Sequence, residues 1–442
     1  MALGKARKKQ QGSLWVETRQ LEAHGPNPFY EQINRILEKR GFDRRVERAC
    51  RKYYAEKMGR PSLAPGIYFR CFLAGYFEGI DSERGIAYRV ADSLSLRRFL
   101  GLNWEERTPD HSTLSKTRRL LSLGTHKAVF IWMLRLLAKE GLLSGKTVGI
   151  DATTLEANAA LKSLVRRDNG ASYDEHVAQL MKAEGVEAPT AEQRARFDRK
   201  RKKTLSNQEW VNPHDEEARV TQMKDGRTHL AYKAEHAVDF EGGAILAVTV
   251  QPGDRGDCES VHTTLCQAMN AVVDLAGRKA DPDAVGEIPQ VALGGVEEVV
   301  MDKGYHSKPV VWVLRQAELR TVIAEPDRGR QNWKGQEGEQ EAVYANRRCV
   351  KSEGGKALLR KRGEFLERSF AHLYDTGGMR RLHLRGKDNI AKRLLLHAAA
   401  FNLSLILRKL RGAGTARQTR DLREALCFWS WVLRQAAQGL HS

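Results

Sequence analysis

Two short apolar segments that each end in an aspartate constrain the fold of this chain more than any other feature. The segment "TVGID" ends at Asp151, and the segment "EVVMD" ends at Asp302. Both segments are rich in β-branched residues, which favour strands, and both have the length of a short buried strand. We therefore expect two strands that each present a carboxylate where the strand leaves a sheet.

A later segment, "RGEFLERSFAHL", offers a third carboxylate on a helix. Its apolar residues Leu366, Phe370 and Leu373 recur at positions i, i+4 and i+7, which is the spacing of one helix face. Glu367 borders this apolar stripe and is the preferred third carboxylate. Glu364 lies about one turn earlier on a similar face and is the alternative.

Three carboxylates at one edge of a sheet would form a site for divalent metal ions. Carboxylate oxygens are hard ligands that such ions prefer, and paired ions about 3.5 to 4 Å apart catalyse phosphodiester cleavage. In this interpretation Asp151 bridges the ions, and Asp302 and Glu367 complete the site. Each residue also has a structural interpretation, because Asp151 can cap a helix, Asp302 can belong to a turn and Glu367 can face solvent. Only the combination of the three favours catalysis.

The charge of the chain indicates a polyanionic partner. Its 442 residues include 74 Lys and Arg against 55 Asp and Glu, for a formal net charge of +19. Nucleic acid is the first candidate, and a basic chain whose charge serves only solubility is the alternative. Just after the third carboxylate, basic residues gather at Arg380, Arg381, Arg385, Lys387, Lys392 and Arg393. Such a segment can hold a phosphate backbone, or it can be a solvated loop.

A second basic group lies in the segment "TPDHSTLSKTRRLL", where a capped helix is expected to begin near Asp110. This helix carries Lys116, Arg118 and Arg119 and resembles the second helix of a helix-turn-helix. The three side chains either contact DNA or form a solvated basic face.

The pattern of apolar and polar segments divides the chain into three parts. Residues 1–140 are expected to form an all-helical DNA-binding domain, 141–410 a catalytic domain, and 411–442 a basic helical tail. Within the catalytic domain we expect a polar basic insertion at about 157–228 and a loop from Pro326 to about Glu353. The order strand, hairpin, helix, strand, helix, strand, helix predicts an α/β fold, a ribonuclease H-like mixed sheet flanked by helices.

Cysteine spacing and hydropathy exclude several other classes of protein. The six cysteines contain no C-x-x-C pair, so neither a zinc ribbon nor a redox pair is indicated, and a reducing cytosol is expected. The basic N-terminus lacks the apolar stretch of a secretory signal. The longest apolar stretch, Leu394 to Leu407, is too short to span a bilayer and is expected to be a buried helix. No membrane partner is expected.

These segments resemble bacterial insertion-sequence transposases with a DDE catalytic triad. "GRPSLAPGIYFRCFLAGYFEGIDSERGIAYRVADSLSLRRFLGL" and "TPDHSTLSKTRRLL" resemble the helical N-terminal domain of that family. "GIDATTLEANAALKS", "MKDGRTHLAYKAEHAVD", "DKGYHS" and "FLERSFAHLYDTGGMRRLHLRGKDNIAKRLLLHAAAFNLSLILRKL" resemble its catalytic domain, in the same order along the chain.

The resemblance implies a triad of Asp151, Asp302 and Glu367, a ribonuclease H-like fold and Mg²⁺ or Mn²⁺. It further implies double-stranded DNA as the partner, with terminal inverted repeats and target DNA as the substrates. A homodimer or larger synaptic assembly and a cytoplasmic, nucleoid-associated location are implied as well. Many relatives have an Arg four residues before the glutamate and a Lys seven residues after it. Here these positions are Gly363 and Tyr374.

Two other functions are compatible with the same sequence. A nuclease or resolvase with this sheet would hydrolyse DNA without joining it to a target. A transposase-derived protein without catalysis would bind DNA through its helical domain. A strand-transfer assay separates the first from a transposase, and loss of a triad carboxylate would indicate the second.

Overall fold

The computed structural model describes residues 27–55, 62–103, 105–200, 205–223, 226–276, 291–292, 294–329, 331–412, 414 and 418. Apart from its first residues, the predicted basic tail at 411–442 lies outside this part of the chain. The basic N-terminus and residues 201–204 and 224–225 of the predicted polar basic insertion also lie outside it.

The N-terminal part is helical, as predicted. Its helices are α2 (Pro28–Lys39), α3 (Phe42–Cys50), α4 (Pro65–Phe77), α5 (Glu83–Asp92), α6 (Leu94–Phe99), α7 (His111–Leu120) and α8 (Leu123–Lys139). Side-chain caps explain several starts, since the carboxylate of Asp110 accepts from the Thr113 N–H and the Ser122 hydroxyl accepts from the Thr125 N–H. α7 therefore begins where the sequence predicted.

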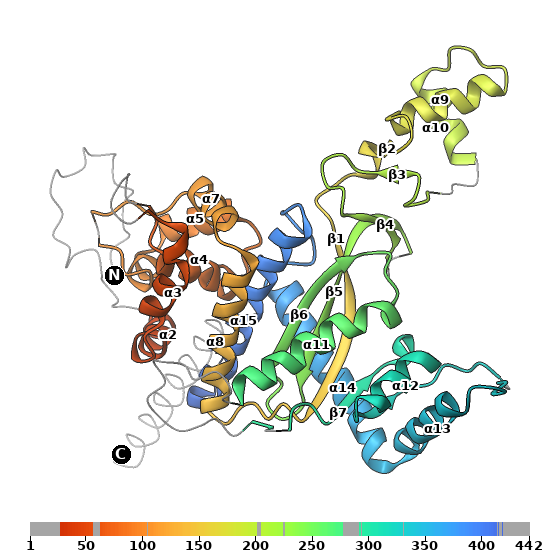
Figure 1. The fold of residues 1–442 in the computed structure, drawn as a ribbon. Helices are drawn as coiled ribbons and strands as arrows, with labels where there is room; N and C mark the ends of the chain where they lie inside the picture. Colours follow the sequence, from red (N-terminus) through yellow and green to blue (C-terminus); the bar gives the residue numbers. More distant parts are fainter. Residues whose placement is uncertain are drawn as a thin grey trace, which may run out of the picture.

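A mixed sheet occupies the centre of the molecule (Figure 1). Its strands are β1 (Thr147–Glu156), β4 (Arg219–Gln222), β5 (Thr228–Asp239), β6 (Ile245–Pro252), β7 (Glu298–Met301) and β8 (Arg320–Ile323). β5 pairs antiparallel with β1, whereas β1, β7 and β8 are mutually parallel. The order β6-β5-β1-β7-β8 confirms the predicted ribonuclease H-like mixed sheet, and β4 extends it beside the start of β5.

Helices pack on the sheet and close both of its edges. α11 (Asp257–Leu275) packs on β5 and β6, and α14 (Glu353–Phe370) crosses β1, β5 and β7. On the outer edge of β6, the Asn402 amide of α15 (Lys387–Arg411) bonds both the N–H and the C=O of Ile245. On the outer edge of β8, Asn346 of α13 (Glu337–Lys351) bonds Ile323 in the same way. The two asparagines satisfy backbone groups that an open sheet edge would leave unpaired.

Helix α14 approaches β1 closely because residue 149 is a glycine. A Cβ atom at Gly149 would collide with the ring of Phe240 and lie 3.3 Å from the Leu366 side chain. The glycine therefore lets Leu366 pack directly over the strand that carries Asp151. After α14 the chain continues as a π-helical turn, Ala371–Thr376, before Gly377 and Gly378.

The helical part and the sheet share one continuous hydrophobic core. Figure 1 shows α8 and α15 between the N-terminal helices and the sheet, and α15 contacts α4, α8 and β6. α15 is long and apolar enough to cross a membrane, yet 94% of its most apolar window is buried in the protein. It is the buried helix that the sequence predicted, here at the centre of the molecule.

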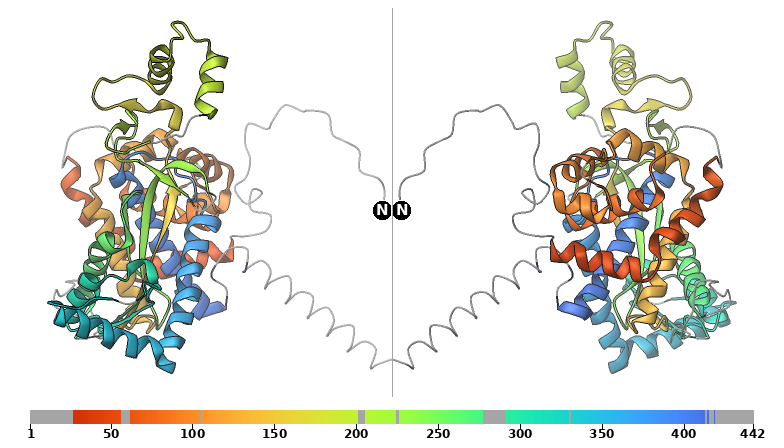
Figure 2. Two further views of the ribbon diagram at one scale, coloured as in Figure 1. Left: turned by 90° about the vertical axis from the view of Figure 1, so that its right-hand side faces the viewer. Right: turned by 90° about the vertical axis from the view of Figure 1, so that its left-hand side faces the viewer.

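Two parts of the chain differ from the expectation. The predicted loop at 326–353 contains helix α13, which the abundant Gly and Gln residues of this segment concealed. The polar insertion contains two helices, α9 (Tyr173–Ala183) and α10 (Ala191–Lys200), and a two-stranded sheet of β2 (Val165–Arg166) and β3 (Trp210–Val211). It stands out from the end of β1, whereas α12 (Lys308–Gln316) and α13 lie at the opposite end of the molecule (Figures 1 and 2).

Candidate active site

Asp151 lies in β1, and Asp302 directly follows the neighbouring parallel strand β7 at the same level. Ile150 of β1 is paired with Met301 of β7, and each is followed directly by one of the aspartates. Asp302 follows the last residue of β7 as expected, whereas β1 continues five residues past Asp151 to Glu156, so the expectation that Asp151 lies where its strand leaves the sheet is wrong. The negative charge of Asp302 contributes to a raised pKa of Asp151, as expected for two carboxyl groups that lie close together.

Asp151 is a largely buried carboxylate with one cationic partner. Its side chain is 21% exposed and accepts hydrogen bonds from the Arg362 guanidinium (2.8 Å) and from the Ala152 N–H (2.8 Å). Burial raises the pKa of this carboxyl, the guanidinium and the N–H act in the opposite direction, and the charge of Asp302 raises it again. The predicted structural alternative, a helix cap, does not apply because Asp151 lies inside β1.

Asp302 begins a short 3₁₀ turn, Lys303–Tyr305, and its Oδ1 accepts from the Gly304 N–H (2.9 Å). The structural alternative for this residue is therefore realised. The two interpretations are compatible, since a turn that holds one carboxylate oxygen also fixes the direction of the side chain.

A buried network that the sequence reasoning missed anchors this turn from the other face of the sheet. The Glu235 carboxylate is fully buried and accepts from the Tyr305 hydroxyl (2.8 Å), the Ser260 hydroxyl (2.7 Å) and the Thr264 hydroxyl. Lys233 Nζ bonds the Ser260 hydroxyl (2.8 Å) and lies 3.9 Å from the same carboxylate. Tyr305 is three residues after Asp302, so the network holds the turn that presents Asp302. The feature of the sequence that could have indicated this network is the pair Lys233 and Glu235, which lie two residues apart in a strand that is buried along most of its length.

The third predicted carboxylate lies on α14, which docks on the sheet through Arg362, Leu366 and Ser369. Arg362 contacts Asp151, Leu366 packs over Gly149, and the Ser369 hydroxyl bonds His236 Nδ1 (3.0 Å). The predicted stripe is correct at Leu366 and Leu373, which are buried, while Phe370 is partly buried. Glu367 lies beside this face with an exposed side chain.

Glu364, the alternative to Glu367, is also exposed on α14. Glu364 lies 3.9 Å from the Arg368 guanidinium, which packs against Gly243 in the turn between β5 and β6. That turn follows Asp239, the partner of Val148 near the start of β1. Glu364 therefore has a cationic neighbour near this turn, and the preference for Glu367 stays a prediction.

The structure brings the two aspartates together but not all three carboxylates. Within the described ranges, no three Asp, Glu, His or Cys side chains are grouped closely enough to hold a metal ion. Arg362 supplies the positive charge at Asp151. The donor set of the two aspartates nevertheless fits a divalent cation, because carboxylate oxygens are the ligands such ions prefer and the pairing of β1 with β7 brings both residues to the same level.

The basic segment after α14 runs along the end of β1. The Glu156 N–H donates to the Arg380 C=O, and the Leu382 N–H donates to the Glu156 C=O. Arg380 Nη1 lies 3.4 Å from the Thr153 hydroxyl, two residues beyond Asp151. Arg381 is 73% exposed, and exposed Arg385 donates to the Asn158 C=O. Arg380 therefore lies near the level of Asp151, whereas Arg381 and Arg385 lie farther along the chain, beside Glu156 and Asn158.

Three other basic residues do not lie on a DNA-accessible surface. Arg118 was predicted to contact DNA, but its side chain is 7% exposed, forms an ion pair with Glu83 (2.6 Å) and bonds Asn389. Arg118 therefore joins α7 to α5 and α15. Lys392 and Arg393 of the predicted basic cluster are buried as well, because α15 is a core helix. Lys116 and Arg119 remain exposed on α7.

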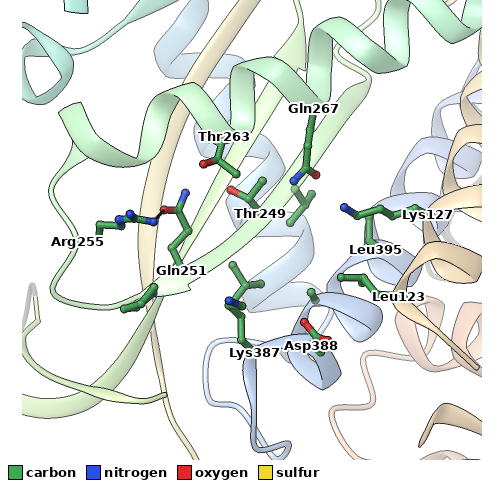
Figure 3. A pocket seen from close by; sticks show the side chains of 14 residues that line it. Leu123, Lys127, Thr249, Gln251, Arg255, Thr263, Gln267, Lys387, Asp388 and Leu395 are labelled. Carbon is green, nitrogen blue, oxygen red and sulfur yellow. Dashed lines mark hydrogen bonds between the residues drawn. The ribbon is translucent and has the colours of Figure 1, made fainter. Parts of the chain in front are cut away.

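A separate cavity of about 210 Å³ with a mixed polar and apolar lining lies between α8, β6, α11 and α15 (Figure 3). Lys127, Arg255 and Lys387 contribute to its lining, whereas Asp151, Asp302 and Glu367 do not. Two of these cations face acids, since Arg255 lies 3.9 Å from Glu259 and Lys387 lies 3.8 Å from Glu217. The cavity is therefore not part of the carboxylate site.

Comparison with known families agrees with the geometry. Residues 150–403 match the family described as a transposase DDE domain, and residues 19–120 match the family described as a transposase domain. The first match covers more than half of the chain and includes both aspartates and Glu367. A comparison with curated proteins gives no match. The chain belongs to the transposase DDE domain family.

Proposed function

We propose that this protein is a DNA transposase that cuts at the terminal inverted repeats of an insertion sequence and joins the freed ends to target DNA. The observation that carries the proposal is the parallel pairing of β1 and β7, which brings Asp151 and Asp302 to the same level, with exposed basic residues farther along β1. The family membership makes DNA the substrate. In this proposal Asp151, Asp302 and Glu367 are the catalytic carboxylates.

The carboxylates of Asp151 and Asp302 would hold Mg²⁺ or Mn²⁺, and Glu367 would complete the set. When bound, such ions activate the attacking oxygen and stabilise the charge that develops on the phosphate and leaving group. Glu367, whose side chain is exposed, must approach the aspartates for this arrangement.

The reaction takes place in two displacements at phosphorus. In the first, water attacks the phosphate at the end of the element; an O–P bond forms, and the bond to the 3′ oxygen breaks. In the second, the freed 3′-hydroxyl attacks a phosphodiester of the target, and the target's own 3′ oxygen leaves. No side chain forms a covalent intermediate, so the chain's own task is to position substrate and charge.

The exposed arginines of the segment 380–385 are proposed to hold the DNA backbone next to the carboxylates. The exposed Lys116 and Arg119 on α7 are proposed as further contacts. Arg118 takes no part in binding, since it is buried. Because two ends of the element must react together, we propose that a homodimer or a larger assembly acts in the bacterial cytoplasm.

The proposed function is tested with the full chain, Mg²⁺ or Mn²⁺, DNA that carries the inverted repeats flanking its gene, and a target plasmid. We expect cleavage at the repeat and covalent joining of its 3′ end to the plasmid. Cleavage without joining would instead indicate a nuclease or resolvase. Specific binding without cleavage would indicate a DNA-binding protein without catalysis.

Replacement of Arg381 by alanine is expected to weaken DNA binding by a similar factor for all sequences. If Arg381 neutralises one phosphate, the slope of log affinity against log salt should become less steep by about one. Binding is measured at several salt concentrations with and without the repeat sequence. Arg118→Gln is the contrasting variant, for which lower thermal stability and an unchanged slope are expected. An unchanged slope in Arg381→Ala would contradict the assignment.

A further inference from the structure

One side chain of the site has no role in the chemistry described so far. Arg362 donates to Asp151 across 2.8 Å, and both side chains are largely buried, at 17% and 21% exposure. Arg362 belongs to α14, whereas Asp151 belongs to β1, so the ion pair joins the helix to the strand.

The same helix carries both this arginine and the proposed third carboxylate. Arg362 and Glu367 are five residues apart, which corresponds to about 7.5 Å along the helix axis. In the structure the arginine contacts Asp151, and Glu367 is exposed. Across the described ranges, no third ligand joins the two aspartates.

A buried carboxylate needs a positive partner, because taking a charge out of water is costly unless it is paired. Near Asp151 the charge of Asp302 increases that need. Arg362 meets it through Asp151 Oδ2. A divalent cation at the same carboxylate would face a guanidinium a few ångströms away, and the two positive charges would repel each other.

We propose that Arg362 is the resident counterion of Asp151 and competes with the divalent metal ion for this carboxylate. The proposal rests on the proposed function, which makes Asp151 a metal ligand. In the metal-free chain Arg362 keeps the site folded and neutralised. Metal binding then requires the guanidinium to leave Asp151, and the departure opens the space between α14 and β1 that Glu367 must approach.

A purely structural ion pair predicts the opposite effect on metal binding. If Arg362 only holds α14 in place, its removal loosens the site and weakens metal affinity. If it competes with the metal, its removal strengthens affinity even though the metal-free fold becomes less stable. The direction of the change therefore distinguishes the two roles.

The test compares the Mn²⁺ affinity of the wild type with that of variants at Arg362. Affinity is measured on the full chain without DNA, by titration calorimetry or by the electron paramagnetic resonance signal of free Mn²⁺. Arg362→Gln removes the charge and keeps most of the side-chain volume. This variant is expected to bind Mn²⁺ about tenfold more tightly than the wild type, because that is the effect of removing one nearby positive charge from a partly screened site. Arg362→Lys retains the charge and should change affinity less. Arg360→Gln removes an equal charge from an exposed position on the same helix and is expected to stay within about twofold of the wild type.

Thermal unfolding gives a second readout. Without metal, Arg362→Gln should melt below the wild type, and saturating Mn²⁺ should raise its melting temperature by more than that of the wild type. Equal or weaker Mn²⁺ binding by Arg362→Gln would overturn the proposal. If Asp151→Asn and Asp302→Asn bind Mn²⁺ as well as the wild type, the metal site of the proposed function fails instead.

Discussion

Asp151→Asn and Asp302→Asn are each expected to lower the rate of metal-dependent cleavage at the repeat ends by roughly a thousandfold or more. Each substitution removes a charged oxygen ligand of the metal ions, and these ions contribute several kcal/mol to stabilisation of the transition state. Because about 1.4 kcal/mol corresponds to a factor of ten in rate, loss of this stabilisation accounts for the expected decrease. The rate is measured with labelled repeat-containing DNA under single-turnover conditions.

Binding of the same DNA should change little in both variants, because the proposed phosphate contacts lie on the segment 380–385. Asp274→Asn in the last turn of α11 is the matched control and should cleave at the wild-type rate. Wild-type cleavage by either of the first two variants would refute the assignment of the site. A parallel loss of DNA binding and of thermal stability would show that the aspartates act on the fold.

Glu367→Gln is expected to lower cleavage by roughly a hundredfold or more, whereas Glu364→Gln should lower it by less than about threefold. The two residues lie on one helix and receive the same substitution, so general effects on α14 cancel. Glu364 faces Arg368 near the β5–β6 turn, and its exposed ion pair contributes little to stability. Single-turnover rates of the two variants, compared at saturating metal, decide between them. A greater loss in Glu364→Gln would reverse the choice and would require α14 to turn on the sheet.

Local patterns were sufficient to predict the strands and the two aspartates. β7 and the first half of β1 are apolar runs rich in β-branched residues, but β1 continues past Asp151 to Glu156, beyond the change to polar residues that was expected to mark its end. Caps such as Asp110 act within one turn of helix, so the start of α7 could also be read from neighbouring residues. Helix α13 was missed because its Gly- and Gln-rich sequence has weak helical signals, and its packing on β8 through Asn346 depends on distant residues.

Burial of charged residues could not be predicted, because it depends on which elements pack together. Arg118 belongs to a basic run on an amphipathic helix, and only the approach of α5 and α15 buries it against Glu83. Glu235 likewise became a buried anchor because α11 and the turn at Tyr305 supply three hydroxyl donors.

By itself, the sequence determined the helical first part, the ribonuclease H-like order of strands and the two aspartates, since these follow from residues close together in the chain. Only the tertiary structure placed Asp302 beside Asp151, through the parallel pairing of β1 and β7. It also placed Arg362, 211 residues away in sequence, on the carboxylate of Asp151. Such contacts arise when a helix docks on a sheet to bury its apolar face, and the partner of a charged side chain is then set by the docking geometry.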